Sequence, residues 1–156
     1  MPSVEREPAA VCTVVRFVIA HHEYVAEIER IREIIFYRPS VPVPHAPAFL
    51  EGVIDLRGRV IPLIDLRERL GIAGSPDARP RHILVVEWGD RVGGLVVDEV
   101  RDVVDIARDQ VQIPEAADTR SRLCRGVCRL RDDLLLLVDL DAVLSPDDQV
   151  ALAGVV

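Results

Sequence analysis

The feature that most constrains how this chain can fold is a repeat of its own sequence at a separation of 74 residues. The stretch "GVIDLRGRVIPLIDLRERL" at residues 52–70 aligns without a gap with "GVCRLRDDLLLLVDLDAVL" at residues 126–144. Glycine, arginine and aspartate match in register together with the aliphatic residues, so shared composition is a weaker explanation than duplication. An internal repeat of this kind indicates that one structural unit is used twice.

The regions upstream of the two stretches correspond as well. "VVRFVIAHHEYVAEIERIREII" resembles "LVVEWGDRVGGLVVDEVRDVV", and residues 31–35 match residues 100–104 within them. Each region then passes into a connection that contains proline, one starting at residue 39 and the other at residue 114. We therefore expect one domain at 11–150 between tails at 1–10 and 151–156, with two subdomains at about 11–72 and 82–144.

Short β-strands separated by turns account for most of the pattern. Only 4% of the residues are aromatic, so the core must be aliphatic, and valine and isoleucine favour strands. Residues 29–35 fit either a helical turn or a strand. The strands are predicted at 11–20, 23–28, 52–57, 59–64, 82–88, 91–98, 124–131 and 134–139. This pattern predicts an all-β fold with short helices, in which two small barrels pack together.

The turns at the tips of the two repeated hairpins are expected to need a residue with a positive φ. Gly58 lies at the tip of the first, where a positive φ costs glycine little, and Asp132 is its counterpart in the second. Alternation places Arg57 on the same strand face as Asp55. Arg57 is then either a solvated charge at a strand end or a functional residue, and its recurrence as Arg131 fits both interpretations.

A short helix is predicted after each hairpin. Asp65 is a candidate N-cap, Glu68 completes a capping box, and Gly71 ends the helix. The second helix is predicted to begin at Asp139 and to end near residues 145–146. The two aspartates also occupy equivalent positions, which leaves open an enzyme that uses them as a carboxylate pair. Helix capping explains both residues more simply.

Other catalytic or metal-binding patterns are missing from the sequence. Cys124 and Cys128 are four residues apart on a predicted strand, which is too far to share one ion. Neither a G-x-S-x-G motif nor a glycine-rich phosphate loop occurs. Trp88 is interpreted as a core or turn-flanking residue, and Gly93 and Gly94 as a bulge or a close backbone approach. We therefore expect a binding module without catalytic, cofactor-binding or metal-binding residues.

Composition narrows the class of partner. The chain has 156 residues and a net charge of −7, which fits a globular protein and disfavours nucleic acid as a partner.

Its longest strongly apolar run, residues 134–138, is far too short to cross a bilayer, and no signal peptide is evident. Three cysteines without a disulfide framework favour a reducing compartment. The sequence thus predicts a cytoplasmic protein without direct membrane insertion.

Three segments resemble the CheW family, the chemotaxis coupling proteins. They are "PHAPAFLEGVIDLRGRVIPLIDLRERLG", "RHILVVEWGDRVGGLVVDEVRDVV" and "CRGVCRLRDDLLLLVDLDAVL", and the likeness runs from about Val11 to about Leu144. The resemblance implies two five-stranded SH3-like β-barrels around a shared hydrophobic centre. It also implies an adaptor without a cofactor, which couples methyl-accepting chemoreceptors to a CheA-type histidine kinase at a membrane-associated receptor array.

The resemblance also assigns residues to the receptor contact. Arg57 of "DLRG" matches the family arginine that supports receptor coupling, and Glu33 and Ile34 match positions near the receptor-binding groove. Gly52 matches the glycine that opens the motif, while Asp55 stands where the motif often has Asn. The partners implied are the cytoplasmic tip of a chemoreceptor and the regulatory domain of the kinase, which has the same fold. Apolar barrel-end surfaces in both halves are expected to meet the kinase, without assigned residues.

Other functions remain open at this point. A divergent member of the family could serve another chemosensory-like pathway, in motility or development, and bind receptor without coupling kinase. A CheV-like protein and a detached regulatory module of the kinase share the fold. The alternative from a different class is the enzyme that uses Asp65 and Asp139.

Overall fold

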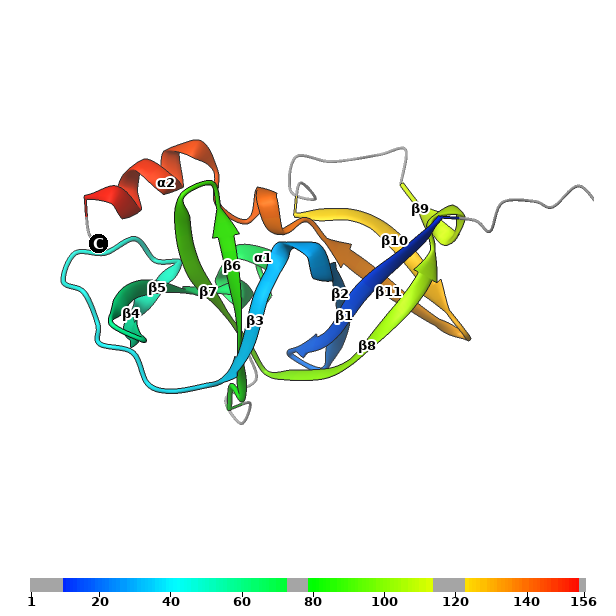
Figure 1. The fold of residues 1–156 in the computed structure, drawn as a ribbon, viewed down its shortest axis with the longest axis horizontal. Coiled ribbons are helices and arrows are strands. Elements are labelled where there is room, and N and C mark those ends of the chain that lie inside the picture. The colour runs from blue at the N-terminus through cyan, green and yellow to red at the C-terminus, as the bar shows by residue number, and fades with distance from the viewer. Residues whose placement is uncertain (1–9, 73–78, 114–122, 155–156) are drawn as a thin grey trace, which may run out of the picture.

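The computed structural model describes residues 10–72, 79–113 and 123–154, which form two β-sheets and several short helices. Sheet A has the strand order β8-β1-β2-β11-β10-β9, and sheet B has the order β3-β6-β7-β5-β4. Figure 1 shows the sheets as two lobes side by side, with the C-terminal helix α2 over the lobe of sheet B. The strands of sheet A are β1 (Val11–Ile19), β2 (His22–Glu27), β8 (Glu99–Ala107), β9 (Val111–Gln112), β10 (Cys124–Leu130) and β11 (Asp133–Val138). Those of sheet B are β3 (Ile31–Phe36), β4 (Leu50–Leu56), β5 (Arg59–Asp65), β6 (His82–Trp88) and β7 (Arg91–Val97).

The two sheets do not divide the chain into an N-terminal and a C-terminal half. Strands β1 and β2 join sheet A with β8 to β11, while β6 and β7 join sheet B with β3 to β5. Each half of the chain therefore gives one hairpin to the sheet of the other half, and a parallel strand pair makes each connection. Leu63 of β5 lies opposite Gly94 of β7, and Leu136 of β11 lies opposite Tyr24 of β2. The predicted subdomains at 11–72 and 82–144 therefore do not coincide with the two sheets, because each sheet contains strands from both ranges. The two copies resemble each other, so a hairpin from one fits the sheet of the other.

The duplication itself is visible in the pairing. If each strand is replaced by its equivalent in the other copy, the order of sheet B becomes that of sheet A without β9. Both motif hairpins also have the same irregularity, since a register shift occurs between Leu50 and Gly52 and again between Cys124 and Gly126. The repeat read from the sequence thus corresponds to two related sheets.

The matched glycines have a packing reason. A Cβ atom on Gly52 would collide with Ser40 and with the carbonyl of Val41, a residue that bridges to β4. A Cβ atom on Gly126 would lie 2.9 Å from the carbonyl oxygen of Gln112 in β9. In both sheets a neighbouring chain segment approaches the hairpin so closely that no side chain fits.

The tips of the two hairpins differ from the prediction in one position. Arg57 and Gly58 have φ values of 53° and 84°, and the Gly58 N–H donates to Asp55 Oδ1 at 2.8 Å. In the second hairpin Arg131 has a φ of 56°, whereas Asp132 does not have a positive φ. The prediction for Gly58 is confirmed and that for Asp132 is wrong. Two successive residues with positive φ suit a turn whose second residue is glycine. Asp132 takes that second place in the other hairpin, and a negative φ there avoids the energetic cost that a non-glycine residue would have.

The predicted caps are largely confirmed. The side chain of Asp65 accepts a hydrogen bond from the Arg67 N–H at the start of α1 (Leu66–Leu70), and Gly71 ends this helix with a φ of 68°. The capping box with Glu68 does not form, because the Asp65 N–H already donates to the carbonyl of Phe49 at 2.8 Å. Residues 29–35, which fitted two structures, contain both: a 3₁₀ turn at Ile28–Arg30 leads into β3.

The C-terminal part differs from the prediction. After Asp139 there is only a 3₁₀ turn at Leu140–Ala142, and α2 (Pro146–Ala153) begins where the sequence predicted an end. Ser145 caps α2 through a capping box with Asp148. Leu152 is only 2% exposed, so residues 151–153 belong to the packed fold although they were assigned to the tail. Proline at the first helical position favours a helix start rather than an end.

Three apolar clusters form the core. One fills the sheet A lobe, another fills the sheet B lobe, and the largest lies between the two lobes. Trp88 belongs to the shared cluster, and its Nε1–H donates to the carbonyl of Leu140 at 2.7 Å. The pairing of β6 with β7 has no register shift, so Gly93 and Gly94 do not mark a bulge. Instead, their missing side chains make room for Trp88 on one face and Ile83 on the other.

Candidate functional site

Two of the predicted site residues meet at the turn between β4 and β5. Arg57 Nη1 lies 2.8 Å from Glu33 Oε1, so an ion pair joins this turn to the edge strand β3. The hydrogen bond from Arg57 lowers the pKa of the Glu33 carboxyl group and raises that of the guanidinium. The side chain of Arg57 is still 71% exposed, which leaves donors free to meet a partner.

A small hollow adjoins this ion pair. Its floor consists of apolar side chains that include Ile61, Val85 and Val92 from the interior cluster of the sheet B lobe. Arginines lie around its edge: Arg32 pairs with Glu87, Arg57 pairs with Glu33, and Arg59 donates to the carbonyl of Asp90. At about 200 Å³ the hollow is smaller than typical small-molecule pockets, and one inserted side chain fits it better.

Ile34 lies on the opposite face of β3 from Glu33. It pairs with Leu84, whose side chain packs in the central cluster between the lobes. Phe36 shares this face, and the two side chains are 38% and 81% exposed. Figure 1 shows β3 in the middle of the molecule, where the two lobes meet. The edge strand thus carries a charged pair toward one face and apolar side chains toward the other.

Gly52 does not belong to this surface. It lies at the register shift in β4, beneath Ser40 and Val41, and is buried. Its place in the motif therefore has a structural reason. Sequence reasoning missed Phe36, although its position two residues after Ile34 on a strand places it on the same exposed face.

The second half of the chain does not repeat the charged pair. By the repeat, Asp102 and Val103 correspond to Glu33 and Ile34, and Arg131 corresponds to Arg57. Asp102 pairs instead with Arg16 at 2.9 Å, and Arg131 makes no ion pair within the described parts of the chain. The duplicated fold therefore presents this ion pair on the lobe of sheet B alone, as far as the described residues go.

A larger hollow lies between β5, β7 and the C-terminal segment. Its volume is about 610 Å³, and it is lined mainly by apolar side chains such as Val60, Trp88 and Leu152, with Arg59 and Arg91 among its charged residues. It is a surface at the end of a barrel, the kind expected for the kinase contact, and that contact stays a prediction.

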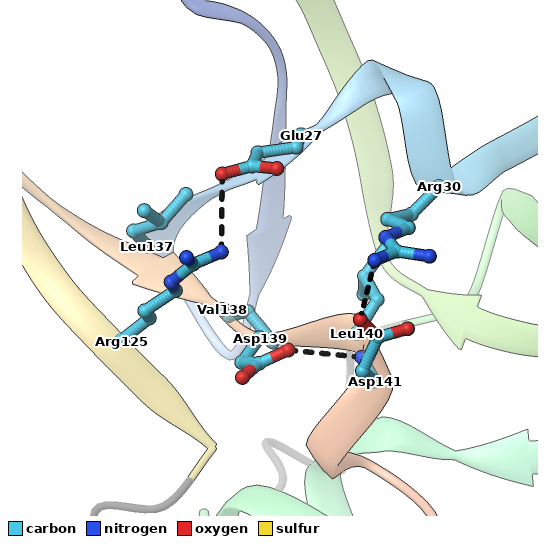
Figure 2. A pocket seen from close by; sticks show the side chains of 8 residues that line it. All are labelled: Glu27, Arg30, Arg125, Leu137, Val138, Asp139, Leu140 and Asp141. Carbon is cyan, nitrogen blue, oxygen red and sulfur yellow. Dashed lines mark hydrogen bonds and ion pairs between the residues drawn. The ribbon is translucent and has the colours of Figure 1, made fainter. Parts of the chain in front are cut away.

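Figure 2 shows a polar pocket where β2 and the following 3₁₀ turn meet β10 and the segment after β11. Glu27 and Arg125 lie 3.4 Å apart, and Arg30 and Asp141 lie 2.9 Å apart. The Asp139 carboxylate in this pocket accepts from the Asp141 N–H at 3.0 Å. Asp139 thus caps a 3₁₀ turn and Asp65 caps α1 in the other half, which supports the capping interpretation over a catalytic pair.

Other chemical candidates give little support for a reactive centre. Burial raises the pKa of the Cys12, Cys124 and Cys128 thiols, which keeps them protonated and less nucleophilic. No cluster of three or more potential metal ligands occurs among residues 10–72, 79–113 and 123–154. Within the described residues, the surfaces that suit binding of a partner include the two faces of β3 and the hollows beside Arg57 and Trp88.

Comparison with known proteins identifies the family. The family model described as the CheW-like domain matches residues 13–147. The chain belongs to the CheW-like domain family. It is 35% identical over 139 residues to the chemotaxis protein CheW of Rhizobium meliloti, a match that covers 88% of this chain and 90% of that protein. It is 33% identical to the chemotaxis protein CheW of Klebsiella aerogenes, with 85% of this chain and 81% of that protein covered.

A solved structure of the family has the same fold as this CheW-like domain. The crystal structure of the scaffolding protein TtCheW from Thermoanaerobacter tengcongensis superposes with a TM-score of 0.80 at 27% sequence identity, covering 89% of this chain and 96% of that one. The predicted fold class, two SH3-like β-barrels, is thereby confirmed. The chain is a member of a family of chemotaxis scaffold and adaptor proteins. In the described regions, every helix is too short or too polar to cross a membrane.

Proposed function

We propose that this chain is an adaptor that holds a chemoreceptor tip and the regulatory domain of a CheA-type kinase side by side. Membership of the CheW-like family supports this proposal, as do the curated relatives named chemotaxis protein CheW. The structural observation that carries it is the exposed Arg57–Glu33 ion pair at the edge of sheet B. This pair joins two of the residues that the family resemblance assigns to receptor coupling.

The receptor contact follows from the chemistry of β3 and its turn. A receptor tip is a helical hairpin, and a helix that lays its apolar face on an apolar surface is a recurrent mode of recognition. Ile34 supplies apolar surface on one face of the strand, while Arg57 supplies a positive charge that is held in place by Glu33. A charge at the rim of an interface fixes orientation and register more than it adds affinity.

The kinase contact is proposed at the barrel-end hollow lined by Trp88 and Leu152. This hollow is the larger of the two at that end of the molecule, and its apolar lining suits a protein surface of similar chemistry. It adjoins the Arg57 hollow, because Arg59 and Val92 line both. An adaptor of this kind would hold its two partners on neighbouring surfaces, and an array supplies avidity to contacts that are weak individually.

The test is a binding experiment with both partners. A receptor signalling fragment and a kinase regulatory domain are each titrated into the full chain, and then the kinase domain is titrated into the complex of chain and receptor. We expect binding in all three titrations. A chain that binds neither partner would contradict the adaptor role, and binding that is mutually exclusive would contradict the coupling role.

A second candidate is a divergent member of the family that binds receptor but does not couple the kinase. The chain is 35% identical over 98 residues to Protein PilI of Pseudomonas aeruginosa, which covers 60% of this chain and 55% of that protein. That relative is not named for chemotaxis, so the domain is not restricted to proteins with that name. The same titrations discriminate, because this candidate predicts receptor binding without kinase binding.

A further inference from the structure

The chain crosses from sheet B to sheet A in one step, between β7 and β8. Strand β7 ends at Val97 and β8 begins at Glu99, so Asp98 alone separates them. Backbone hydrogen bonds hold this crossing. The Asp98 N–H donates to the carbonyl of Val18 at 3.0 Å, and the Arg81 N–H donates to the carbonyl of Asp98 at 3.0 Å. The position of one lobe relative to the other therefore depends in part on the bonds at this crossing.

One further bond at the crossing uses a side chain whose charge depends on pH. The Val100 N–H of β8 donates to Nδ1 of His82 in β6 at 3.1 Å, which joins sheet A to sheet B. A ring nitrogen accepts a hydrogen bond only when it carries no proton, so His82 is neutral here and its proton is on Nε2. A protonated imidazole has two donors and no acceptor. Histidine is the side chain that ordinarily changes its charge between about pH 5 and about pH 8.

The surroundings of His82 give its charged form little compensation. The ring of Phe36 in β3 stacks on the imidazole with 5.6 Å between the ring centroids, and Val97 lies opposite His82 in β7. Neither side chain is charged, and an exposed aromatic ring attracts a cation only weakly. The charged groups that flank the crossing are paired with other residues, as Glu99–Arg81, Arg101–Glu23 and Asp98–Arg67. Among the described residues, no carboxylate forms an ion pair with His82.

We propose that His82 is a pH-sensitive joint between the two lobes, formed when the imidazole is neutral and broken when it takes up a proton from solvent. A proton on Nδ1 sets two donors against each other, so the Val100 N–H loses its acceptor at a partly buried site. The unfolded chain binds this proton without such a loss. The unfolded state therefore binds more protons at this residue, and the stability that the joint contributes rises with pH. Acidification loosens the contact between β6 and β8, while the pairing within each sheet persists. This inference does not depend on the proposed function.

The experiment compares thermal melts of the full chain at about pH 7.5 and about pH 5.5, on either side of the usual titration of histidine. In His82→Asn the side-chain carbonyl can accept from the Val100 N–H at both pH values. We expect the melting temperature of the wild type to fall by at least about 3 °C more than that of His82→Asn. Groups elsewhere titrate alike in both proteins, so the difference reports on position 82. His45→Asn is the matched control, because His45 is exposed and its φ of 59° suits asparagine. It is expected to follow the wild type.

Two measurements on the wild type decide the question even if His82→Asn does not fold. The ¹⁵N NMR spectrum of the imidazole is expected to show the His82 proton on Nε2 at the higher pH. Hydrogen exchange of the Val100 amide, corrected for its intrinsic dependence on pH, is expected to lose at least about tenfold in protection at the lower pH. A proton on Nδ1 at the higher pH would overturn the proposal. Equal falls in melting temperature for the wild type and His82→Asn would also overturn it, as would unchanged protection of the Val100 amide.

Discussion

Arg69 of α1 and Asp148 of α2 form an ion pair at 2.8 Å that ties the C-terminal helix to the first half of the chain. The same guanidinium donates through Nε to the carbonyl of Val143 at 2.9 Å and lies over the ring of Phe49. The carboxylate of Asp148 also accepts from the Ser145 N–H within the capping box. One arginine therefore connects α1, the segment before α2 and the helix α2 itself.

We predict that Arg69→Met lowers the free energy of unfolding by about 1.5–3 kcal/mol, because it removes charge-assisted bonds at a mostly buried site. Arg129→Met is the control, since Arg129 is exposed on β10 and its change is expected to stay within about 0.5 kcal/mol. Urea denaturation measures both. An equal, small effect in the two variants would show that the Arg69 connections do not stabilise the fold.

We predict that Arg57→Glu weakens receptor binding by about tenfold or more and leaves the melting temperature nearly unchanged. The substitution replaces the exposed cation with a carboxylate beside Glu33, so a partner would meet repulsion. Surface ion pairs contribute little to stability, so the fold is expected to persist. Calorimetric titration and a thermal melt measure the two quantities.

The matched control is Arg131→Glu, at the equivalent turn of the other hairpin. Arg131 shares the positive φ of Arg57 but not the ion pair with β3. Its variant is therefore expected to bind receptor normally. A large drop in melting temperature for Arg57→Glu, with intact binding of the folded fraction, would show that Arg57 is structural.

The repeat made much of this fold predictable. Hairpins, caps and the glycine at the first tip depend on local sequence, and Asp65, Gly58 and Gly71 behave as their types require. Strand partners depend on distant contacts, and two similar copies leave open which hairpin joins which sheet. The parallel pairing of Leu63 with Gly94 places the β6–β7 hairpin in sheet B, and no local sequence pattern predicts this pairing.

The candidate site was predicted only in part, for a related reason. Arg57 and Glu33 were named separately, and their ion pair joins segments 24 residues apart along the chain. Alternation on a strand could have separated Glu33 from Ile34 and grouped Ile34 with Phe36. The sequence pattern predicts a helix end near Ser145 and Pro146, whereas the capping box with Asp148 makes these two residues the start of α2.

We predict that Gly52→Ala lowers the free energy of unfolding by about 1–3 kcal/mol, because the new methyl group needs space occupied by the Val41 carbonyl. Gly154→Ala is the control, since the nearest atom to its added Cβ is 3.8 Å away and its φ is −80°. Denaturant unfolding compares the two. If Gly52→Ala is as stable as the wild type but loses receptor binding, Gly52 contacts the partner directly.

We predict that Glu51→Gln stabilises the protein at pH 7. Burial raises the pKa of the Glu51 carboxyl group, although Tyr37 and Ser40 donate hydrogen bonds to it. A folded-state pKa above the unfolded value means that stability is greatest below the unfolded pKa and falls as pH rises through the folded pKa. Glutamine has no charge to bury and lacks this loss. Urea denaturation from pH 3.5 to 7.5 should therefore show the variant gaining on the wild type as pH rises, and a constant difference across this range would contradict the burial argument.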